Sequence, residues 1–440
     1  MKFWQRGFLR PLKRRWFPLL LSLITLAFIA IPVALSQQPV TLRLLMTAPD
    51  VPPWRDNLVK AFNEQQNRIR LEVVEGPNSP NLIEDLYTTA FLLGNSPYDL
   101  VNMDVTWAAK FASAGWLQDL TDEFSEADLA PFSPQDIEGG KYNGRLYRIP
   151  VRSDAGVLYY RKDLIDKAGL QPPQSFPDII KISKEVQQRG LARWGYLWQG
   201  KQYEGTTAMF VEVIRGFNGF WINPDTLEVG LDRPEVIQAV EFLRSTIAEG
   251  VSPPGVTTYV EEDTRRIFQA GDAVFLRSWP YVWPLANQPN SPINGKMGIM
   301  PMIGAANGSI SGSCLGGWGL GVAKTSKHLK EALEAIRFIT SEAAQKQFIL
   351  DAGYVPSRRS LFTDPQVVAK YEHYPQLLQI VDRAVLRPPI AQYAQASDIL
   401  QRYLSAAITN QMTPEAAMQQ AAKETRLLLE SARRDRQEKP

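Results

Sequence analysis

The chain has 440 residues, with 48 lysines and arginines against 46 aspartates and glutamates, so its formal net charge is +2. This length exceeds one ordinary hydrophobic core and predicts two domains. The balanced charge gives no reason to expect a nucleic-acid partner. The single cysteine, Cys314, excludes an intramolecular disulfide and a thiolate zinc site.

The first segment of the chain combines basic residues with a long apolar run. Six lysines and arginines lie within residues 2–15, and the apolar run covers 16–35. With the small residues Ala34 and Ser36 at its exit, this pattern predicts an export signal over 1–36, cleaved before Gln37. The run is also long enough to span a bilayer, so an uncleaved N-terminal anchor is the alternative. In both cases we expect a periplasmic protein, either soluble or tethered to the membrane.

Strands and helices alternate in the next part of the chain. Apolar patterns predict strands at 42–46, 69–73 and 98–103, with helices around 58–62 and 82–92. This βαβαβ order predicts a parallel sheet covered by helices. Ligands of such sheets bind at the carboxyl ends of the strands, which places Asp104, just past the third strand, for contact.

A second α/β region is predicted after a short hairpin. Asn143 and Gly144 form a two-residue turn signal, so 141–150 is predicted as a hairpin. The stretch 151–160 is predicted to be partly extended. Further helices are expected around 179–188, 208–214 and 234–248, and the chain from 330 onward is predicted to be mostly helical.

The side chains available for chemistry favour binding over catalysis. The two histidines do not have metal-ligand spacing, and neither a nucleophile elbow nor a P-loop is present. By contrast, Trp279 precedes a proline, and Trp318 lies among Gly316, Gly317 and Gly319. A flat ring can cover the C–H face of a sugar while acids and arginines bind its hydroxyls, so the pattern favours a carbohydrate cleft. Ordinary core packing is the alternative for each tryptophan.

Six segments carry a family resemblance. They are KYNGRLYRIP at 141–150, GVLYYRKDLI at 156–165, IFQAGDAVFLRSWPY at 267–281, GGWGLGV at 316–322, and the helical stretches 332–348 and 413–427. In this order the segments resemble the extracellular solute-binding proteins of ABC-type sugar importers, the group of the maltose- and trehalose/maltose-binding proteins. The resemblance covers nearly the whole chain after the signal.

The resemblance implies a fold and a function. The fold is the two-lobed periplasmic-binding-protein fold (type II) of the α/β class, with three hinge crossings and a ligand cleft between the lobes. Lobe 1 would comprise 40–148 and 281–326, and lobe 2 would comprise 152–277 and 330–440. The implied function is that of a receptor, without catalysis or cofactor. It would close on a neutral disaccharide or small glycoside of the trehalose, maltose, sucrose or glucosylglycerol class and deliver it to a pair of ABC permease subunits. We expect a monomer.

The resemblance also implies ligand-binding residues. It assigns two carboxylates, two aromatic rings, one backbone position and one guanidinium to the cleft: Asp104, Asp154, Trp279, Trp318, Gly317 and Arg387. Arg152 is added to this set as a departure, because close relatives tend to have an aromatic residue two positions before Asp154.

Simpler structural roles remain open for these residues. Asp104 could cap the helix that follows it, Asp154 could fix the hinge, and Arg387 could pair with a surface carboxylate. Two other functions also remain open. An exported glycosidase would use paired carboxylates, although no such pair is evident within one lobe. The second open function is the binding of another polar solute, such as a peptide or a polyamine.

Overall fold

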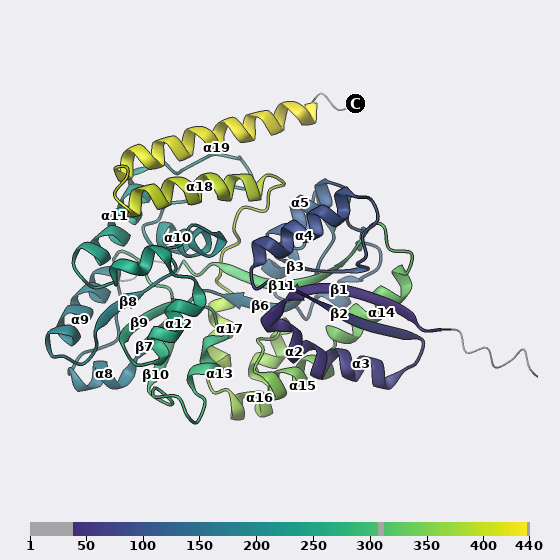
Figure 1. The fold of residues 1–440 in the computed structure, drawn as a ribbon, viewed down its shortest axis with the longest axis horizontal. Coiled ribbons are helices and arrows are strands. Elements are labelled where there is room, and N and C mark those ends of the chain that lie inside the picture. The colour runs from purple at the N-terminus through teal and green to yellow at the C-terminus, as the bar shows by residue number, and fades with distance from the viewer. Residues whose placement is uncertain (1–37, 307–311, 438–440) are drawn as a thin grey trace, which may run out of the picture.

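The computed structural model describes residues 38–306 and 312–437. The predicted signal at 1–36 lies outside the described residues. Within the described ranges, no helix is both long enough and apolar enough to cross a membrane. Figure 1 shows two lobes side by side, joined by strands and loops that pass between them.

The strands of lobe 1 lie in two small sheets. β1 (Val40–Thr47) and β2 (Ile69–Gly76) pair in parallel, as the sequence predicted. β3 (Leu100–Asp104) pairs instead with β11 (Leu315–Val322), and this pairing is antiparallel. β11 also pairs antiparallel with β6 (Ile149–Ala155). Local patterning located β3 but could not indicate its partner, because β11 lies more than 200 positions further along the chain.

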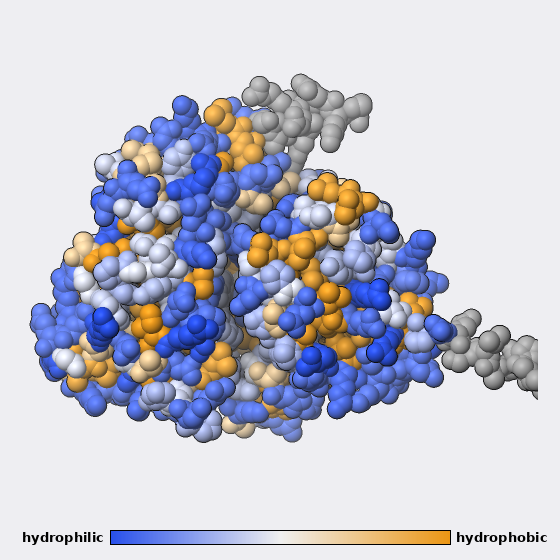
Figure 2. Space-filling view, viewed as in Figure 1, coloured by the Kyte–Doolittle hydropathy of each residue, from blue (hydrophilic) through white to orange (hydrophobic). Residues whose placement is uncertain are grey.

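Helices bury the apolar faces of these two sheets. The helices on this lobe are α2 (Val51–Trp54), α3 (Lys60–Gln65), α4 (Pro80–Leu92), α5 (Trp107–Ser113), α6 (Glu126–Leu129), α7 (Pro134–Glu138), α14 (Leu329–Ile339) and α15 (Glu342–Ala352). On α4, Ile83, Tyr87 and Phe91 face the core at helical spacing. The same helix exposes Leu82 and Leu86, and Figure 2 shows apolar side chains gathered over it.

The predicted hairpin is also present in this lobe. β4 (Lys141–Tyr142) and β5 (Arg145–Leu146) pair antiparallel. Asn143 and Gly144 between them have φ of 50° and 75°, as a type I′ turn requires.

Lobe 2 is built on a four-stranded sheet with the order β10-β7-β9-β8. Its strands are β7 (Val157–Arg161), β8 (Trp194–Leu197), β9 (Ala273–Ser278) and β10 (Met297–Pro301). Around it lie α8 (Lys162–Lys167), α9 (Phe176–Gln188), α10 (Glu204–Gly216), α11 (Pro234–Ala248), α12 (Glu261–Gln269), α18 (Tyr393–Ile408) and α19 (Pro414–Gln437). α13 (Val282–Ala286), α16 (Pro365–Lys370) and α17 (Tyr374–Val381) pack below the region where the lobes meet (Figure 1).

Two stretches pack with the opposite lobe from the one that the sequence suggested. β10, within the range 281–326 expected in lobe 1, pairs with β7 of lobe 2. α14 and α15, within the range 330–440 expected in lobe 2, contribute Ile336 and Phe348 to the core of lobe 1. The difference arises because a strand follows its hydrogen-bonding partner and a helix follows the surface that buries its apolar face, and neither is encoded locally.

A buried ion pair lies where the chain passes from lobe 1 to lobe 2. Gly156 joins β6 to β7, and a Cβ atom at this position would lie 1.6 Å from Oε1 of Glu212. Glu212 pairs with Arg277 through two N···O distances of 2.7 Å, and both side chains are fully buried. The backbone N–H of Cys314 also donates to Glu212, at 3.1 Å. One carboxylate therefore ties α10, β9 and the residue before β11 to the hinge.

Candidate functional site

Four of the predicted site residues lie on one face of the lobe 1 sheet. Trp318 on β11 is paired with Asp104 on β3 and with Arg152 on β6, and Gly316 is paired with Asp154. Directly opposed residues of neighbouring strands point to the same face. β3 and β6 both run antiparallel to β11, so their carboxyl ends meet at one edge. The sequence predicted Asp104 just past the third strand, and the structure makes it the last residue of β3.

Trp318 forms part of the wall of this edge. Its ring is half-buried and meets Trp107 edge to face, with centroids 5.3 Å apart and planes at 83°. Gly317 beside it has φ of 120°, and a Cβ atom there would lie 2.4 Å from the carbonyl oxygen of Arg152. The glycines around Trp318 are therefore explained by close packing of β11 against its neighbours.

Trp279 approaches the same edge from lobe 2. It follows β9, is half-buried, and donates from Nε1 to Oε1 of Glu261 at 3.4 Å. The Arg277 guanidinium lies 4.3 Å from its ring centroid. Its ring also leaves no room for a side chain at Gly316 of lobe 1, where a Cβ atom would lie 2.8 Å from the ring. Trp279 is thus held at the contact between the lobes.

A first charged group surrounds Arg152. Its Nε lies 2.9 Å from Asp154, and its Nη1 lies 3.4 Å from Asp50. The Tyr354 hydroxyl donates to Asp50, and the Arg152 guanidinium lies 5.2 Å from the centroid of the Tyr354 ring. Burial lowers the pKa of Arg152, but the nearby carboxylates of Asp154 and Asp50 outweigh that effect and raise it. Burial raises the pKa of Asp154 despite the attraction of Arg152.

Asp50, Arg152 and Tyr354 of this group line a small hollow together with Trp54 and Trp318. The space open within it is about 10 Å³, which is no more than one water molecule needs. A ring-sized solute could therefore enter only if the lobes or these side chains moved.

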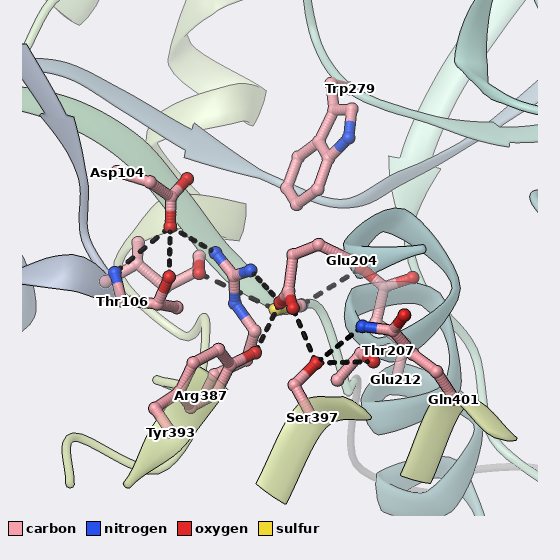
Figure 3. Close-up of polar contacts among 12 residues, drawn as sticks. Asp104, Thr106, Glu204, Thr207, Glu212, Trp279, Arg387, Tyr393, Ser397 and Gln401 are labelled. Carbon is pink, nitrogen blue, oxygen red and sulfur yellow. Dashed lines mark hydrogen bonds and ion pairs between the residues drawn. The ribbon is translucent and has the colours of Figure 1, made fainter. Parts of the chain in front are cut away.

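A second charged group surrounds Arg387 (Figure 3). Its Nη2 donates to Oδ1 of Asp104 at 3.1 Å, and its Nη1 donates to Oε1 of Glu204 at 2.6 Å. Glu204 also accepts from the Tyr393 hydroxyl and, at 2.6 Å, from the Ser397 hydroxyl. Burial raises the pKa of Glu204 despite the opposing effect of Arg387. Arg387 therefore pairs with half-buried carboxylates between the lobes, and not with a surface carboxylate.

The structure brings the predicted residues together and adds others that sequence reasoning missed. The capping role weighed for Asp104 is not present, because α5 begins after Thr106 as its N-cap residue and has no side-chain cap hydrogen bond. Asp104 Oδ1 instead accepts the Thr106 N–H at 3.0 Å and the Thr106 hydroxyl at 2.9 Å, which closes a turn before the helix. The additional residues are Asp50, Glu204, Tyr354, Tyr393 and Ser397. None of the five belongs to a sequence motif, so no local signal distinguished them. Among the described residues, no cluster of histidine, cysteine, aspartate and glutamate is arranged to hold a metal ion.

Comparisons with known proteins identify the family of the chain and proteins of similar structure. Residues 48–346 match the family model described as "Bacterial extracellular solute-binding protein". A probable ABC transporter-binding protein of Deinococcus radiodurans is 30% identical over 356 residues, which is 79% of this chain and 84% of that protein. Maltose-bound MalE3 of T. maritima has a TM-score of 0.82 and 36% identity, covering 88% of this chain and 100% of the other. A solute-binding protein of Thermotoga lettingae bound to α-D-tagatose has a TM-score of 0.78 and 25% identity, covering 88% and 98%.

Proposed function

The chain belongs to the bacterial extracellular solute-binding protein family, and we propose that it captures a neutral disaccharide or small glycoside between its lobes. Its role is binding and not catalysis, as in its relatives, so the glycosidase alternative is set aside. We further propose that it works outside the cytoplasm and delivers the solute to an ABC permease pair, in keeping with the relative named as an ABC transporter-binding protein.

One observation carries the assignment of the solute class. Polar and aromatic side chains of both lobes converge on the edge formed by β3, β11 and β6. Lobe 1 supplies Asp104, Asp154 and Trp318, lobe 2 supplies Trp279, and Arg387 lies between them. Carboxylates and guanidinium groups bind hydroxyls, and the rings cover the apolar face of a pyranose. The solutes named for two similar structures, maltose and tagatose, belong to this chemistry.

A solute held by both lobes also provides a reason for closure. Ligand shifts an equilibrium between open and closed forms only through contacts that differ between them. A solute bound by lobe 1 alone, at Asp104 and Trp318, would not favour the closed form, whereas one that also contacts Trp279 does. We therefore propose that Trp279 and Trp318 stack on the solute while Asp104, Asp154, Arg152 and Arg387 bind its hydroxyls, with the Gly317 backbone beside them.

Calorimetric titration tests the proposal. Maltose, trehalose, sucrose and glucosylglycerol are titrated into the purified protein, and at least one should bind stoichiometrically without turnover. Trp318→Ala and Trp279→Ala should each weaken binding by about 2–4 kcal/mol, because a ring at the centre of a contact contributes on that scale. Trp116→Ala is the control, since Trp116 packs on Phe91 and Phe111 in lobe 1. Absence of binding by all four sugars, or unchanged affinity in both variants, would contradict the proposal.

A further inference from the structure

Arg387 is the only side chain shown in Figure 3 that joins a carboxylate of lobe 1 to a carboxylate of lobe 2. Asp104 ends β3 in the lobe 1 sheet. Glu204 begins α10, which packs in the core of lobe 2. Arg387 itself lies on the connection that leads into α18. A chain of three charged groups therefore spans the interface between the lobes.

The lobe 2 end of this chain is firmly held. Glu204 accepts from the Ser397 hydroxyl at 2.6 Å and from the Tyr393 hydroxyl, both on α18. Gln401, one turn further along α18, donates to Ser397 at 2.9 Å. The Arg387 side chain is 3% exposed, and its guanidinium lies 6.0 Å from the Tyr393 ring centroid. Glu204 thus fixes the direction of the guanidinium so that its other terminal nitrogen, Nη2, points at Asp104.

We propose that Glu204 is a positioning residue, and that the bridge Asp104–Arg387–Glu204 holds the two lobes closed when no solute is bound. Opening would separate Asp104 from Arg387, leaving Asp104 without its ion-pair partner and Arg387 with Glu204 alone, which favours the closed form. The bridge uses a carboxylate that the proposed solute would also need. Solute binding would therefore exchange the contact of Asp104 with Arg387 for contacts with hydroxyls, so that part of the closing free energy is already present in the free protein.

The inference concerns the solute-free protein, so its test is independent of the proposed function. Dyes are placed on exposed positions of the two lobes through Asp85→Cys on α4 and Glu241→Cys on α11. The native Cys314 is fully buried and should remain unlabelled. Energy transfer between the dyes then reports the separation of the lobes in the absence of sugar. Glu204→Gln should lower the transfer and shift the population towards the open form, and Arg387→Met should do the same.

A matched control distinguishes the bridge from a general loss of an ion pair. Glu424 also accepts from an arginine and a tyrosine, with Arg402 at 3.0 Å and Tyr403 as partners, but all three lie on α18 and α19 within lobe 2. Glu424→Gln should leave the energy transfer at the wild-type value. If Glu204→Gln does not fold, as judged by circular dichroism, Arg387→Lys replaces it, because lysine keeps the charge but lacks the fork and should open the lobes in part. Unchanged transfer in the folded variants would overturn the inference.

Discussion

Burial of His373 makes the stability of the folded protein depend on pH. Its side chain is 5% exposed, and its ring stacks on Trp283 with centroids 4.1 Å apart and planes at 23°. Burial lowers its pKa from 6.5 to about 3. The imidazole therefore stays neutral in the folded protein at pH values where it is protonated in the unfolded chain. The contribution of His373 to the free energy of unfolding is complete above about pH 6.5 and is lost as the pH falls towards 3.

We expect His373→Phe to reduce the acid sensitivity of the protein. Between pH 6.5 and 5, the unfolded chain of the wild type gains a proton that the folded protein does not, which lowers the free energy of unfolding by about 2 kcal/mol. Phenylalanine keeps a flat ring against Trp283 but cannot take up a proton. Urea titrations at pH 7.5 and pH 5 measure the effect, with His328→Gln as the control. An equal loss of stability in His373→Phe and the wild type would contradict this account.

At the scale of the element, β11 determines how closely the site can be assembled. It lies between β3 and β6 and therefore aligns Asp104, Trp318 and Arg152 in one row. Its glycines allow that approach, because the backbone of β6 and the ring of Trp279 occupy the space where side chains would project. Glycines weaken the strand because they provide no side chains to pack, but they allow close contact between the lobes.

Gly317→Ala should destabilise the protein more than an ordinary glycine replacement. Gly317 has φ of 120°, and the new Cβ atom would lie 2.4 Å from the backbone oxygen of Arg152. Strain and displacement of β6 should together cost about 2–4 kcal/mol. Gly94→Ala is the matched control, because Gly94 also has positive φ, 71°, but no atom lies within 4 Å of its Cβ position. It should cost only about 1 kcal/mol. Equal melting temperatures for the two variants would argue against crowding at Gly317.

At the scale of the whole molecule, the interface between the lobes is more acidic than the chain. The chain has a net charge of +2, whereas the two charged groups contain four carboxylates, Asp50, Asp104, Asp154 and Glu204, and two guanidinium groups, Arg152 and Arg387. Both arginines are already paired with carboxylates. The field at this edge therefore opposes an anionic solute, so we expect the site to favour neutral sugars over uronates and sugar phosphates.

An acidic analogue should bind more weakly than the neutral sugar identified by calorimetry. Two uncompensated negative charges nearby should cost an added carboxylate about 1–2 kcal/mol, which is roughly tenfold or more in Kd. Titration of the matching uronic acid at pH 7.5 measures the difference. Asp154→Asn should reduce the difference in affinity between the acidic and the neutral sugar, because it removes one of the negative charges. Equal affinity for the acidic and neutral forms would show that the charge of the interface does not select the solute.

The sequence alone predicted the first three strands, the hairpin at 141–150, several helices before residue 250 and a mostly helical part from 330 onward, because hydrophobic period and turn residues are local properties. Local patterns did not locate β8, β9 or β10. The strands β1, β2 and β3 and the turn at Asn143 and Gly144 follow from such patterns. The end of the third predicted strand pointed to Asp104, and the family resemblance pointed to Asp104 and Arg387, but as separate residues. No local pattern related them to each other.

The tertiary structure decided which of these pieces meet. Arg387 lies 283 positions from Asp104 and 183 positions from Glu204, yet it contacts both. Likewise, β11 joins β3 and β6 only because the chain returns from lobe 2 to lobe 1, and α14 is found in lobe 1 because its apolar face is buried there. Contacts across such separations depend on strand pairing and on burial of complementary surfaces. These are properties of the folded chain as a whole, and no short segment contains them.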